Sequence, residues 1–315
     1  MFLAPCLALS DTKLSSTESH TYPATGLRGL TLLTTGSENE VLEFLKARPI
    51  HTVIMAGYIR DNGLVSERNR GSFYSYRNRD GRIEGIALIG HATLFETRSE
   101  AAIVAFARLG RTLGRSNLVI GEQRNVEKFW RHFGKAGHVP HELRRELLFS
   151  LDATMFESNW RTKTPRRLCE IRLATRDDFE VVTLTHARLA VEELGLNNPI
   201  AADPDGFLHR CAQRIDQDRV WVLIEDQTLV FKADVVSETP EATYLEGIYV
   251  DPKWRGRGYG LQCLSQLSNH LLRHTRLICL FVDEQNSKAQ AFYRNLGFRQ
   301  RGYYTTIFLR AANRY

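Results

Sequence analysis

One stretch constrains this 315-residue chain more than any other: residues 244–260, which read YLEGIYVDPKWRGRGYG. An apolar segment with an internal glycine leads through a proline-containing turn into a cluster of arginines and glycines, and a long amphipathic segment follows. This order predicts a strand, an anion-binding loop and the start of a helix. The first backbone N–H groups of a helix lack intrahelical partners and lie at the positive end of its dipole, so a phosphate group binds well there.

The loop has the residue types that such a site needs. Gly256, Gly258 and Gly260 let the backbone approach an anion closely and adopt positive φ angles. Arg255 and Arg257 add formal positive charge. An ordinary glycine-rich turn with solvated arginines has the same composition, so a second motif is needed to decide between the two interpretations.

Length and composition set outer bounds on the fold. A chain of 315 residues is long enough for about two domains of roughly 150 residues each. No run approaches the ~18 to 20 apolar residues of a membrane span, and the apolar N-terminal segment lacks the basic flank of a secretory signal. The five cysteines are scattered and have no CxxC spacing. We therefore expect a reduced, cytoplasmic protein without disulfides, preceded by a leader without ordered structure over residues 1–27.

The densest basic patch, residues 68–82, interleaves arginines with Phe73, Tyr74 and Tyr76. Such a composition suits a nucleic-acid surface. It equally suits a hairpin whose aromatic residues face the core and whose arginines face water. No RNA- or DNA-binding motif accompanies the patch, so we do not expect nucleic acid as a partner.

Apolar periodicity predicts alternating strands and helices in both halves of the chain. In the first half, helices are expected over 38–47, 99–113 and 126–133, and strands over 51–59, 70–82 (a hairpin), 83–90 and 117–121. In the second half, helices are expected over 176–194, 205–215, 261–274 and 287–296, and strands over 169–174, 220–225, 228–236, 244–250, 277–282 and 303–309. The polar, basic segment 161–167 is the expected linker.

A second motif decides how the glycine loop is interpreted. Residues 255–260 fit the pattern R-x-x-G-x-G, and Asn286, Ala289 and residues 292–298 fit N-x-x-A-x-x-F-Y-x-x-x-G-F. Together these motifs, with their order and spacing, resemble the GNAT superfamily of acetyl-CoA-dependent N-acetyltransferases over about residues 169–309. The resemblance implies an α/β (α+β) fold with a mixed, mostly antiparallel twisted sheet flanked by helices. A Rossmann fold is the main competitor, but it needs further parallel βαβ units, and too little chain follows Asp283 to form them.

The resemblance also implies how the cofactor is held. Gly247 would form a bulge in the strand. The backbone of Ile248, Tyr249 and Val250 would bind pantetheine and the thioester carbonyl, and Asn286 would reach the pantetheine arm. The pyrophosphate would lie in the loop formed by Arg255, Gly256, Arg257, Gly258, Tyr259 and Gly260.

Catalysis requires two proton transfers. An α-amine with a pKa near ~8 is mostly protonated at neutral pH, so a base must accept a proton. Glu246 is the candidate base, acting through a water, although a carboxylate on the open side of a strand is an equally ordinary structural feature. Tyr293 is the candidate acid for the departing thiolate, with aromatic packing as its alternative role. Asp234 and Lys232 share a face of the neighbouring strand and suit substrate binding.

The first half resembles a degenerate copy of the second. Residues 129–134 align with 292–297 at an offset of 163, and the same offset places 83–90 opposite 246–253. Residues 92–97 would then replace the glycine loop, without its glycines and arginines, so this half is not expected to bind CoA in the usual way. We expect a degenerate GNAT-like domain over 28–160 and a GNAT domain over 168–315, as in tandem GNAT proteins.

The sequence therefore predicts an enzyme that transfers an acetyl group from acetyl-CoA directly to an amine. The alternatives are a non-catalytic CoA-binding sensor or scaffold and a nucleic-acid-associated modifier. No metal is expected, since His270 and His274 share a helix face without a third ligand. The two halves suit packing as a pseudo-dimer within a monomer. The acceptor is not specified by the sequence.

Overall fold

The computed structural model describes residues 28–134, 140–160, 170–194 and 199–309. The expected leader, residues 1–27, and the expected linker, residues 161–167, lie outside the described residues. The described chain forms two compact units. Residues 149–300 make up the C-terminal unit, and residues 28–148 together with 301–309 make up the N-terminal unit.

The N-terminal unit has a sheet of strand order β1-β2-β3-β4-β5-β12-β6. Of the pairings described within it, only β4–β5 is parallel. Its strands are β1 (Leu30–Leu32), β2 (Gly71–Arg77), β3 (Ile83–Gly90), β4 (Ala92–Thr97), β5 (Leu118–Glu122), β12 (Arg299–Leu309) and the first part of β6 (Pro140–Asp152). Its helices are α2 (Glu38–Lys46), α3 (Pro49–Asn62), α4 (Glu100–Leu113), α5 (Gln123–Phe133) and the 3-10 turn η1 (Glu67–Asn69).

The C-terminal unit repeats this plan with the order β6-β11-β10-β9-β8-β7, in which β10–β11 is parallel. Its strands are the end of β6, β7 (Arg172–Leu173), β8 (Val220–Glu225), β9 (Thr228–Glu238), β10 (Thr243–Val250) and β11 (Leu277–Asp283). Its helices are α6 (Ala153–Trp160), η3 (Arg176–Asp178), α7 (Phe179–Leu194), α8 (Pro199–Ala202), α9 (Pro204–Asp216), η4 (Pro252–Trp254), α10 (Tyr259–Leu271) and α11 (Ser287–Asn295). The predicted mixed, mostly antiparallel sheet flanked by helices is confirmed.

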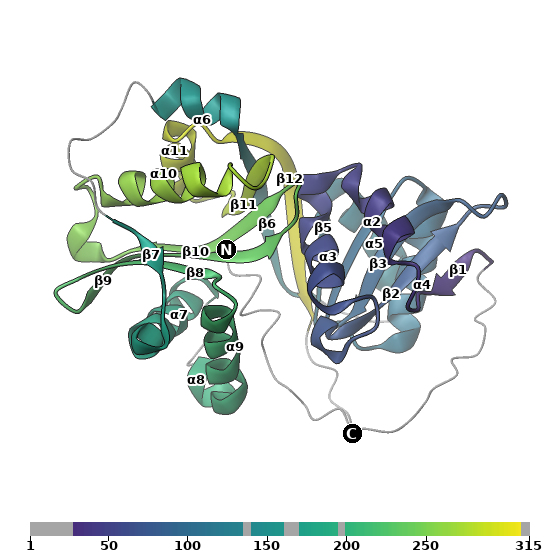
Figure 1. The fold of residues 1–315 in the computed structure, drawn as a ribbon. Coiled ribbons are helices and arrows are strands. Elements are labelled where there is room, and N and C mark those ends of the chain that lie inside the picture. Colours follow the sequence, from purple (N-terminus) through teal and green to yellow (C-terminus); the bar gives the residue numbers. More distant parts are fainter. Residues whose placement is uncertain (1–27, 135–139, 161–169, 195–198, 310–315) are drawn as a thin grey trace. The chain divides into compact units, whose positions relative to one another are not determined.

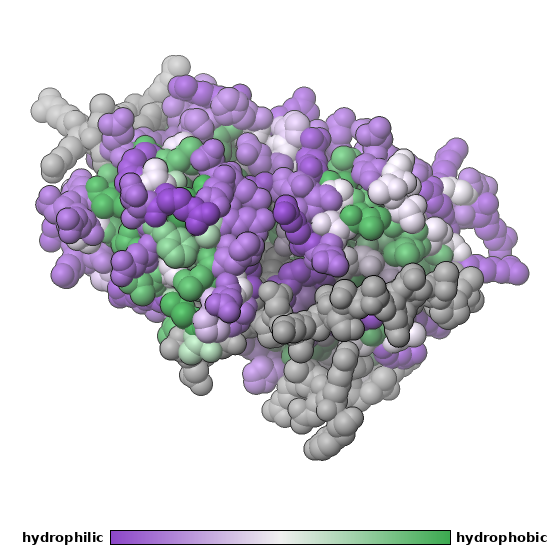
Figure 2. Space-filling model, turned by 60° about the horizontal axis from the view of Figure 1, so that its bottom comes forward, coloured by the Kyte–Doolittle hydropathy of each residue, from purple (hydrophilic) through white to green (hydrophobic). Residues whose placement is uncertain are grey.

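Helices cover both faces of the C-terminal sheet (Figure 1). Helices α6, α10 and α11 lie on one face, and α7, α8 and α9 lie on the other. Figure 2 brings forward the side that carries α7–α9 and shows hydrophobic side chains among hydrophilic ones. Among the side chains of these helices that the structure describes, Leu184 and Val191 of α7 and Leu208 of α9 are large, apolar and exposed. Among the described residues, no helix combines the length and apolar character that crossing a membrane requires.

Each unit takes a strand segment from the sequence of the other half. β12 follows α11 in the chain, yet it pairs with β5 in the N-terminal unit, from Tyr304 opposite Glu122 to Phe308 opposite Leu118. Conversely, residues 149–152 at the end of β6 belong to the C-terminal unit, where β6 neighbours β11. The predicted strand over 303–309 is therefore present, but it completes the sheet of the N-terminal unit.

A strand predicted in the first half is a helix in the structure. Residues 51–59 are not a strand but the middle of helix α3, which begins with Pro49 at its first position. Pro is favoured there because its ring fixes a helical φ and the missing N–H has no intrahelical acceptor. The helix is buried over most of its surface, so it lacks the polar stripe that would have distinguished it from a buried strand.

The arginine–aromatic patch belongs to a hairpin, as expected, but it contributes only one strand, β2, and the turn. The partner strand is β3, not a second strand within residues 70–82. β2 and β3 pair antiparallel from Gly71 opposite Gly90 to Arg77 opposite Ile83. The side chains of Phe73 and Tyr74 are buried in the core, while Arg77 forms an ion pair with Glu40. The buried rings are therefore not available for stacking on bases.

Candidate functional site

The strand β10 opens away from its neighbour. It pairs with β11 only through Thr243 and Tyr244, whereas its pairing with β9 continues to Val250. A register shift lies between Glu246 and Tyr249, and Gly247 has φ of 60°. The predicted bulge at Gly247 is thus confirmed. The edge of β10 beyond Tyr244 carries backbone groups that β11 does not pair, which suits an extended ligand that adds to the edge of a strand.

The glycines of the loop after β10 have different structural roles. Gly256 and Gly258 have φ angles of 74° and 89°, which residues with a Cβ rarely adopt. Gly260 instead allows close packing, because a Cβ there would lie 3.0 Å from a methyl group of Val250 and 3.4 Å from the ring of Phe292. The loop can therefore turn sharply and hold α10 tightly against the end of β10.

Helix α10 begins without a side-chain cap. Its N-cap is Gly258, which has no side chain to accept a hydrogen bond from the first-turn N–H groups. Those groups, together with the positive end of the helix dipole, form an anion-binding position. The side chains of Lys253, Arg255 and Arg257 are exposed around it.

Two of the loop side chains also have structural partners. Nε of Arg255 donates a 2.9 Å hydrogen bond to the carbonyl of Val250 and so ties the loop to the end of the strand. The guanidinium of Arg257 lies 5.8 Å from the ring centre of Trp254, whose ring meets that of Tyr259 edge-on at 4.8 Å. The predicted pyrophosphate loop is therefore a turn held by these contacts, and its charged side chains are exposed to solvent.

Glu246 lies on β10 immediately before the bulge. Its side chain is buried, and its Oε1 accepts a 2.7 Å hydrogen bond from the hydroxyl of Tyr244. The ring of Tyr244 is itself fixed edge-on against Phe281 at 5.4 Å. On β9, Asp234 is the residue directly opposite Glu246, so the two carboxylates lie on the same face of the sheet.

Asp234 belongs to a buried polar cluster between β9, α7 and α9. Its Oδ2 lies 2.6 Å from Nζ of Lys232, 3.4 Å from Nη1 of Arg214 and 3.7 Å from Nδ1 of His186. Lys232 and Asp234 are completely buried. Burial lowers the pKa of Lys232, against the opposing effect of Asp234. Burial, with Lys232 and Arg214 nearby, holds the pKa of His186 well below its usual range, so His186 is neutral.

The residues of the second motif make local structural contacts. Asn286 is the N-cap of α11, and its side chain accepts a 3.0 Å hydrogen bond from the N–H of Ala289. Tyr293 lies on α11 with its side chain half-buried among aromatic rings, 5.2 Å from Phe292, 5.7 Å from Phe298 and 6.5 Å from Phe149. Asn286 and Tyr293 therefore have structural contacts that coexist with the roles the resemblance implies for them.

The remaining predicted residues are placed as follows. Ile248 and Val250 are half-buried on the part of β10 beyond its pairing with β11. Tyr249 is buried, and its hydroxyl accepts a hydrogen bond from Arg188 of α7 at 3.3 Å. Cys263 and Cys279 fill core positions. The described residues hold no group of three or more His, Cys, Asp and Glu suited to a metal ion.

The corresponding strand of the N-terminal unit is β4, not β3. β4 is the strand that pairs parallel with β5, and this pairing ends at Leu94 opposite Ile120. Glu96 lies two residues beyond that last pair, as Glu246 lies two residues beyond Tyr244. The predicted correspondence of 83–90 with 246–253 is therefore wrong, and residues 92–97 form a strand rather than the counterpart of the glycine loop.

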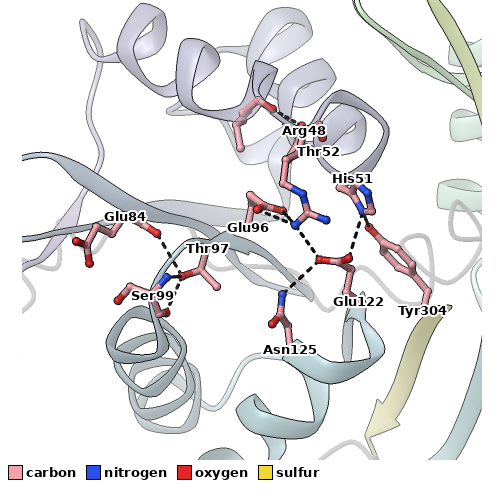
Figure 3. Close-up of polar contacts among 11 residues, drawn as sticks. Arg48, His51, Thr52, Glu84, Glu96, Thr97, Ser99, Glu122, Asn125 and Tyr304 are labelled. Atoms are coloured by element: carbon pink, nitrogen blue, oxygen red, sulfur yellow. Dashed lines mark hydrogen bonds and ion pairs between the residues drawn. The ribbon is translucent and has the colours of Figure 1, made fainter. Parts of the chain in front are cut away.

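An arginine bridges the N-terminal counterpart of the site (Figure 3). Nη1 of Arg48 lies 3.1 Å from Glu96 and 2.8 Å from Glu122 at the end of β5. Burial raises the pKa of Glu96 although Arg48 opposes it, while the hydrogen bond to Glu122 raises the pKa of Arg48. His51 completes the cluster, with Nδ1 2.8 Å from the hydroxyl of Tyr304.

The helix that follows β4 is closed to anions as well. Only Arg98 and Ser99 separate β4 from α4, and the hydroxyl of Ser99 accepts a hydrogen bond from the N–H of Ala102 in the first turn of α4. Arg98 lies over the ring of Phe44 at 4.6 Å. This unit therefore lacks both the glycine loop and the uncapped helix start of the C-terminal unit.

Comparison with known proteins agrees with this geometry. The family model described as "Acetyltransferase (GNAT) domain" matches residues 216–300. No curated protein sequence matches the chain.

Among solved structures, a tandem GNAT protein from the clavulanic acid biosynthesis pathway is 14% identical with a TM-score of 0.56, over 88% of this chain and 97% of that one. A GCN5-related N-acetyltransferase from Sphaerobacter thermophilus is 14% identical with a TM-score of 0.54, over 88% and 94%. A Drosophila protein is 13% identical with a TM-score of 0.64, over 90% and 99%. At these identities the likeness concerns the fold.

Proposed function

We propose that this chain, whose residues 216–300 form a GNAT acetyltransferase domain, transfers an acetyl group from acetyl-CoA to the amine of a small molecule or peptide. One observation carries the proposal: β10 leaves β11 after Tyr244, presents Glu246 beside a bulge at Gly247, and leads through a glycine loop into the uncapped start of α10. The three features provide, in order, a strand edge, a buried carboxylate and an anion-binding turn.

The cofactor is assigned along this path. The backbone of Ile248, Tyr249 and Val250 would bind pantetheine and the thioester carbonyl, and donors fixed there would stabilise the oxyanion of the tetrahedral intermediate. The pyrophosphate would lie on the first turn of α10 and the loop from Arg255 to Gly260. Asn286 would contact the pantetheine arm through the part of its side chain that is not used in capping α11.

The reaction is a direct transfer in which each atom is accounted for. Glu246 accepts a proton from the ammonium of the acceptor through a water, and the amine nitrogen attacks the thioester carbonyl. The resulting tetrahedral intermediate loses a second nitrogen proton to solvent water, its C–S bond breaks as the amide forms, and Tyr293 donates a proton to the departing thiolate. The hydrogen bond from Tyr244 fixes the carboxylate of Glu246 for the first of these transfers.

The N-terminal unit is assigned no catalytic role. Its counterpart of Glu246 is Glu96, whose carboxylate is bound to Arg48, and its helix α4 is capped by Ser99. A CoA-binding site there would require both interactions to break. We propose that this unit supports the chain while the C-terminal unit binds the cofactor.

Calorimetry and turnover test the proposal together. Wild-type protein should bind acetyl-CoA and release CoA thiol in the presence of a panel of amines. Glu246→Gln and Tyr293→Phe should each bind acetyl-CoA normally and lower kcat by about 10² to 10⁴-fold, the usual contribution of a positioned acid or base. Absence of acetyl-CoA binding would overturn the proposal. Binding without transfer to any amine would favour a CoA-binding sensor instead.

A further inference from the structure

The buried cluster around Asp234 contains a carboxylate oxygen without a partner. Oδ2 of Asp234 faces Lys232 and Arg214, whereas its Oδ1 is fully buried and has no hydrogen-bond partner in the described structure. Leaving such an oxygen unsatisfied costs free energy, so a buried acceptor of this kind indicates a donor that binds there. Because Asp234 lies directly opposite Glu246 on the neighbouring strand, that donor would bind beside the proposed base.

The donor is best an ammonium group. Asp234 is completely buried, and a charged donor forms a stronger hydrogen bond to a buried carboxylate oxygen than a neutral donor does. Lys232 cannot serve both oxygens, since its Nζ is 2.6 Å from Oδ2 and the side chain is itself completely buried. An ammonium on Oδ1 is also the group from which Glu246 must take a proton for an amine to react.

Arg214 adds a second, opposite recognition group. Its Nη1 lies 3.2 Å from Nε2 of the neutral His186 and 3.4 Å from Asp234, but its Nε and Nη2 have no partner among the described residues. The side chain is one-fifth exposed, so this edge of the guanidinium lies between the buried cluster and solvent. Two parallel N–H groups on such an edge match a carboxylate.

The unsatisfied oxygen of Asp234 and the solvent-facing edge of Arg214 belong to two side chains that touch. Asp234 and Arg214 contact each other through Oδ2 and Nη1, so a ligand that satisfies both carries a cation and an anion only a few bonds apart. We propose that the acceptor is a compact α-amino acid, held by its ammonium group on Oδ1 of Asp234 beside Glu246 and by its carboxylate on the outer edge of Arg214. This inference rests on the proposed function for the transfer step but not for the binding step.

The amino acid keeps its carboxylate throughout the reaction. Glu246 takes one proton from the ammonium, and the nitrogen forms a bond to the acetyl carbon. The nitrogen then loses a second proton to water, the C–S bond breaks, and CoA leaves as a thiol with the proton from Tyr293. The product is an N-acetyl amino acid, which has lost the positive charge that Asp234 binds. Product release is therefore favoured, because the neutral amide no longer pairs with the buried carboxylate.

The first test compares matched acceptors with the wild-type protein. Each amino acid is paired with the amine that lacks only its carboxylate: valine with isobutylamine, phenylalanine with phenethylamine, ornithine with putrescine. Release of CoA thiol is measured at a fixed concentration of acetyl-CoA. For at least one pair, kcat/KM should be about tenfold or more higher for the amino acid, because the amine leaves Arg214 without its anion. Equal or better use of the amine in every pair would overturn the proposal.

Variants identify the two groups. Arg214→Met should lower kcat/KM for the amino acid by about 10- to 100-fold and leave the paired amine unchanged, while Arg214→Lys should retain part of the preference. Asp234→Asn should raise KM for both members of a pair. Arg176→Met is the control: it removes an arginine that pairs with Asp216 on the surface of the same unit. It should leave kcat/KM unchanged for both the amino acid and its paired amine. If Arg214→Met lowered kcat/KM equally for the amino acid and for its paired amine, the assignment of the carboxylate to Arg214 would be wrong.

A binding measurement separates this inference from the transfer activity. Calorimetry with the best amino acid, added to protein saturated with CoA, should show binding to wild type and about tenfold or more weaker binding to Arg214→Met. Binding without transfer would leave the amino-acid site standing while the proposed function failed. If acetyl-CoA is turned over with amines but no amino acid binds, the inference fails and the proposed function stands. A change in the stability of Asp234→Asn without any change in KM would show that Oδ1 holds only structural water.

Discussion

The hydroxyl of Tyr244 donates a 2.7 Å hydrogen bond to Oε1 of Glu246, and both side chains are buried on one face of β10. The two residues are separated by one position, so the strand itself sets their distance. Tyr244 is fixed in turn against Phe281. The carboxylate is thus aimed by a tyrosine that need not touch the substrate.

Tyr244→Phe tests this positioning role. The variant keeps the ring and its packing but removes the hydroxyl, so kcat should fall by about tenfold, corresponding to one hydrogen bond, while acetyl-CoA affinity stays unchanged. The measurement is CoA release as a function of pH, together with calorimetry. A Tyr244→Phe rate that equals wild type across the pH range would show that the hydrogen bond only stabilises the core.

Gly256→Ala tests the cofactor loop. Gly256 has φ of 74°, and a Cβ added to it would have no other atom within 4 Å, so the substitution strains the backbone without a clash. We expect about 1 kcal/mol of backbone strain and a higher Kd for acetyl-CoA, measured by calorimetry. Gly81→Ala is the matched control, because Gly81 has φ of 77° and equally open surroundings in the N-terminal unit. Equal cofactor affinity in the two variants would contradict the assignment of the loop.

The sequence predicts the backbone of the candidate C-terminal site where its signals are local. Gly247 of β10 and the loop residues Gly256 and Gly258 each specify a backbone feature within a few residues, and the structure shows these features. The partners of Asp234 were only partly predicted. Lys232 is two positions away on the same strand, but His186 and Arg214 come from α7 and α9, and no periodicity links them to β9.

The N-terminal counterpart was misaligned for a physical reason. The offset of 163 that relates FWRHFG (residues 129–134) to FYRNLG (residues 292–297) does not hold further upstream. One cause is that two residues connect β4 to α4 whereas eight connect β10 to α10. Glu96 and Glu246 differ by 150. The bridge from Arg48 to Glu96 and Glu122 spans 48 and 74 residues of sequence, so only the folded sheet reveals it.

Arg48→Met tests whether this bridge is structural. The substitution leaves Glu96 buried without its cation, and breaking a buried ion pair costs about 3 to 5 kcal/mol. Arg48 is 36% exposed, so we expect a smaller loss of about 2 kcal/mol in the free energy of unfolding, measured with urea. Adding Glu96→Gln to Arg48→Met should recover part of the loss. Acetyl-CoA affinity should not change, and a gain of a second binding site would show that Arg48 had been blocking one.

His51 makes the stability of the N-terminal unit depend on pH. Burial, with Arg48 nearby, lowers the pKa of His51 to about 4 in the folded chain, from 6.5. The unfolded chain therefore binds a proton first as the pH falls, so stability is complete above 6.5 and declines between 6.5 and about 4. At pH 5 the loss from this group is at most about 2 kcal/mol.

The hydrogen bond between His51 and Tyr304 provides the matched experiment. His51→Gln keeps a polar side chain that can bond to the Tyr304 hydroxyl but does not titrate, so its urea midpoint should fall less than that of wild type between pH 7.5 and pH 5. Tyr304→Phe removes the partner hydroxyl but keeps the histidine, so it should retain the pH dependence. If His51→Gln and wild type lost the same stability over this range, the titrating group would lie elsewhere in the chain.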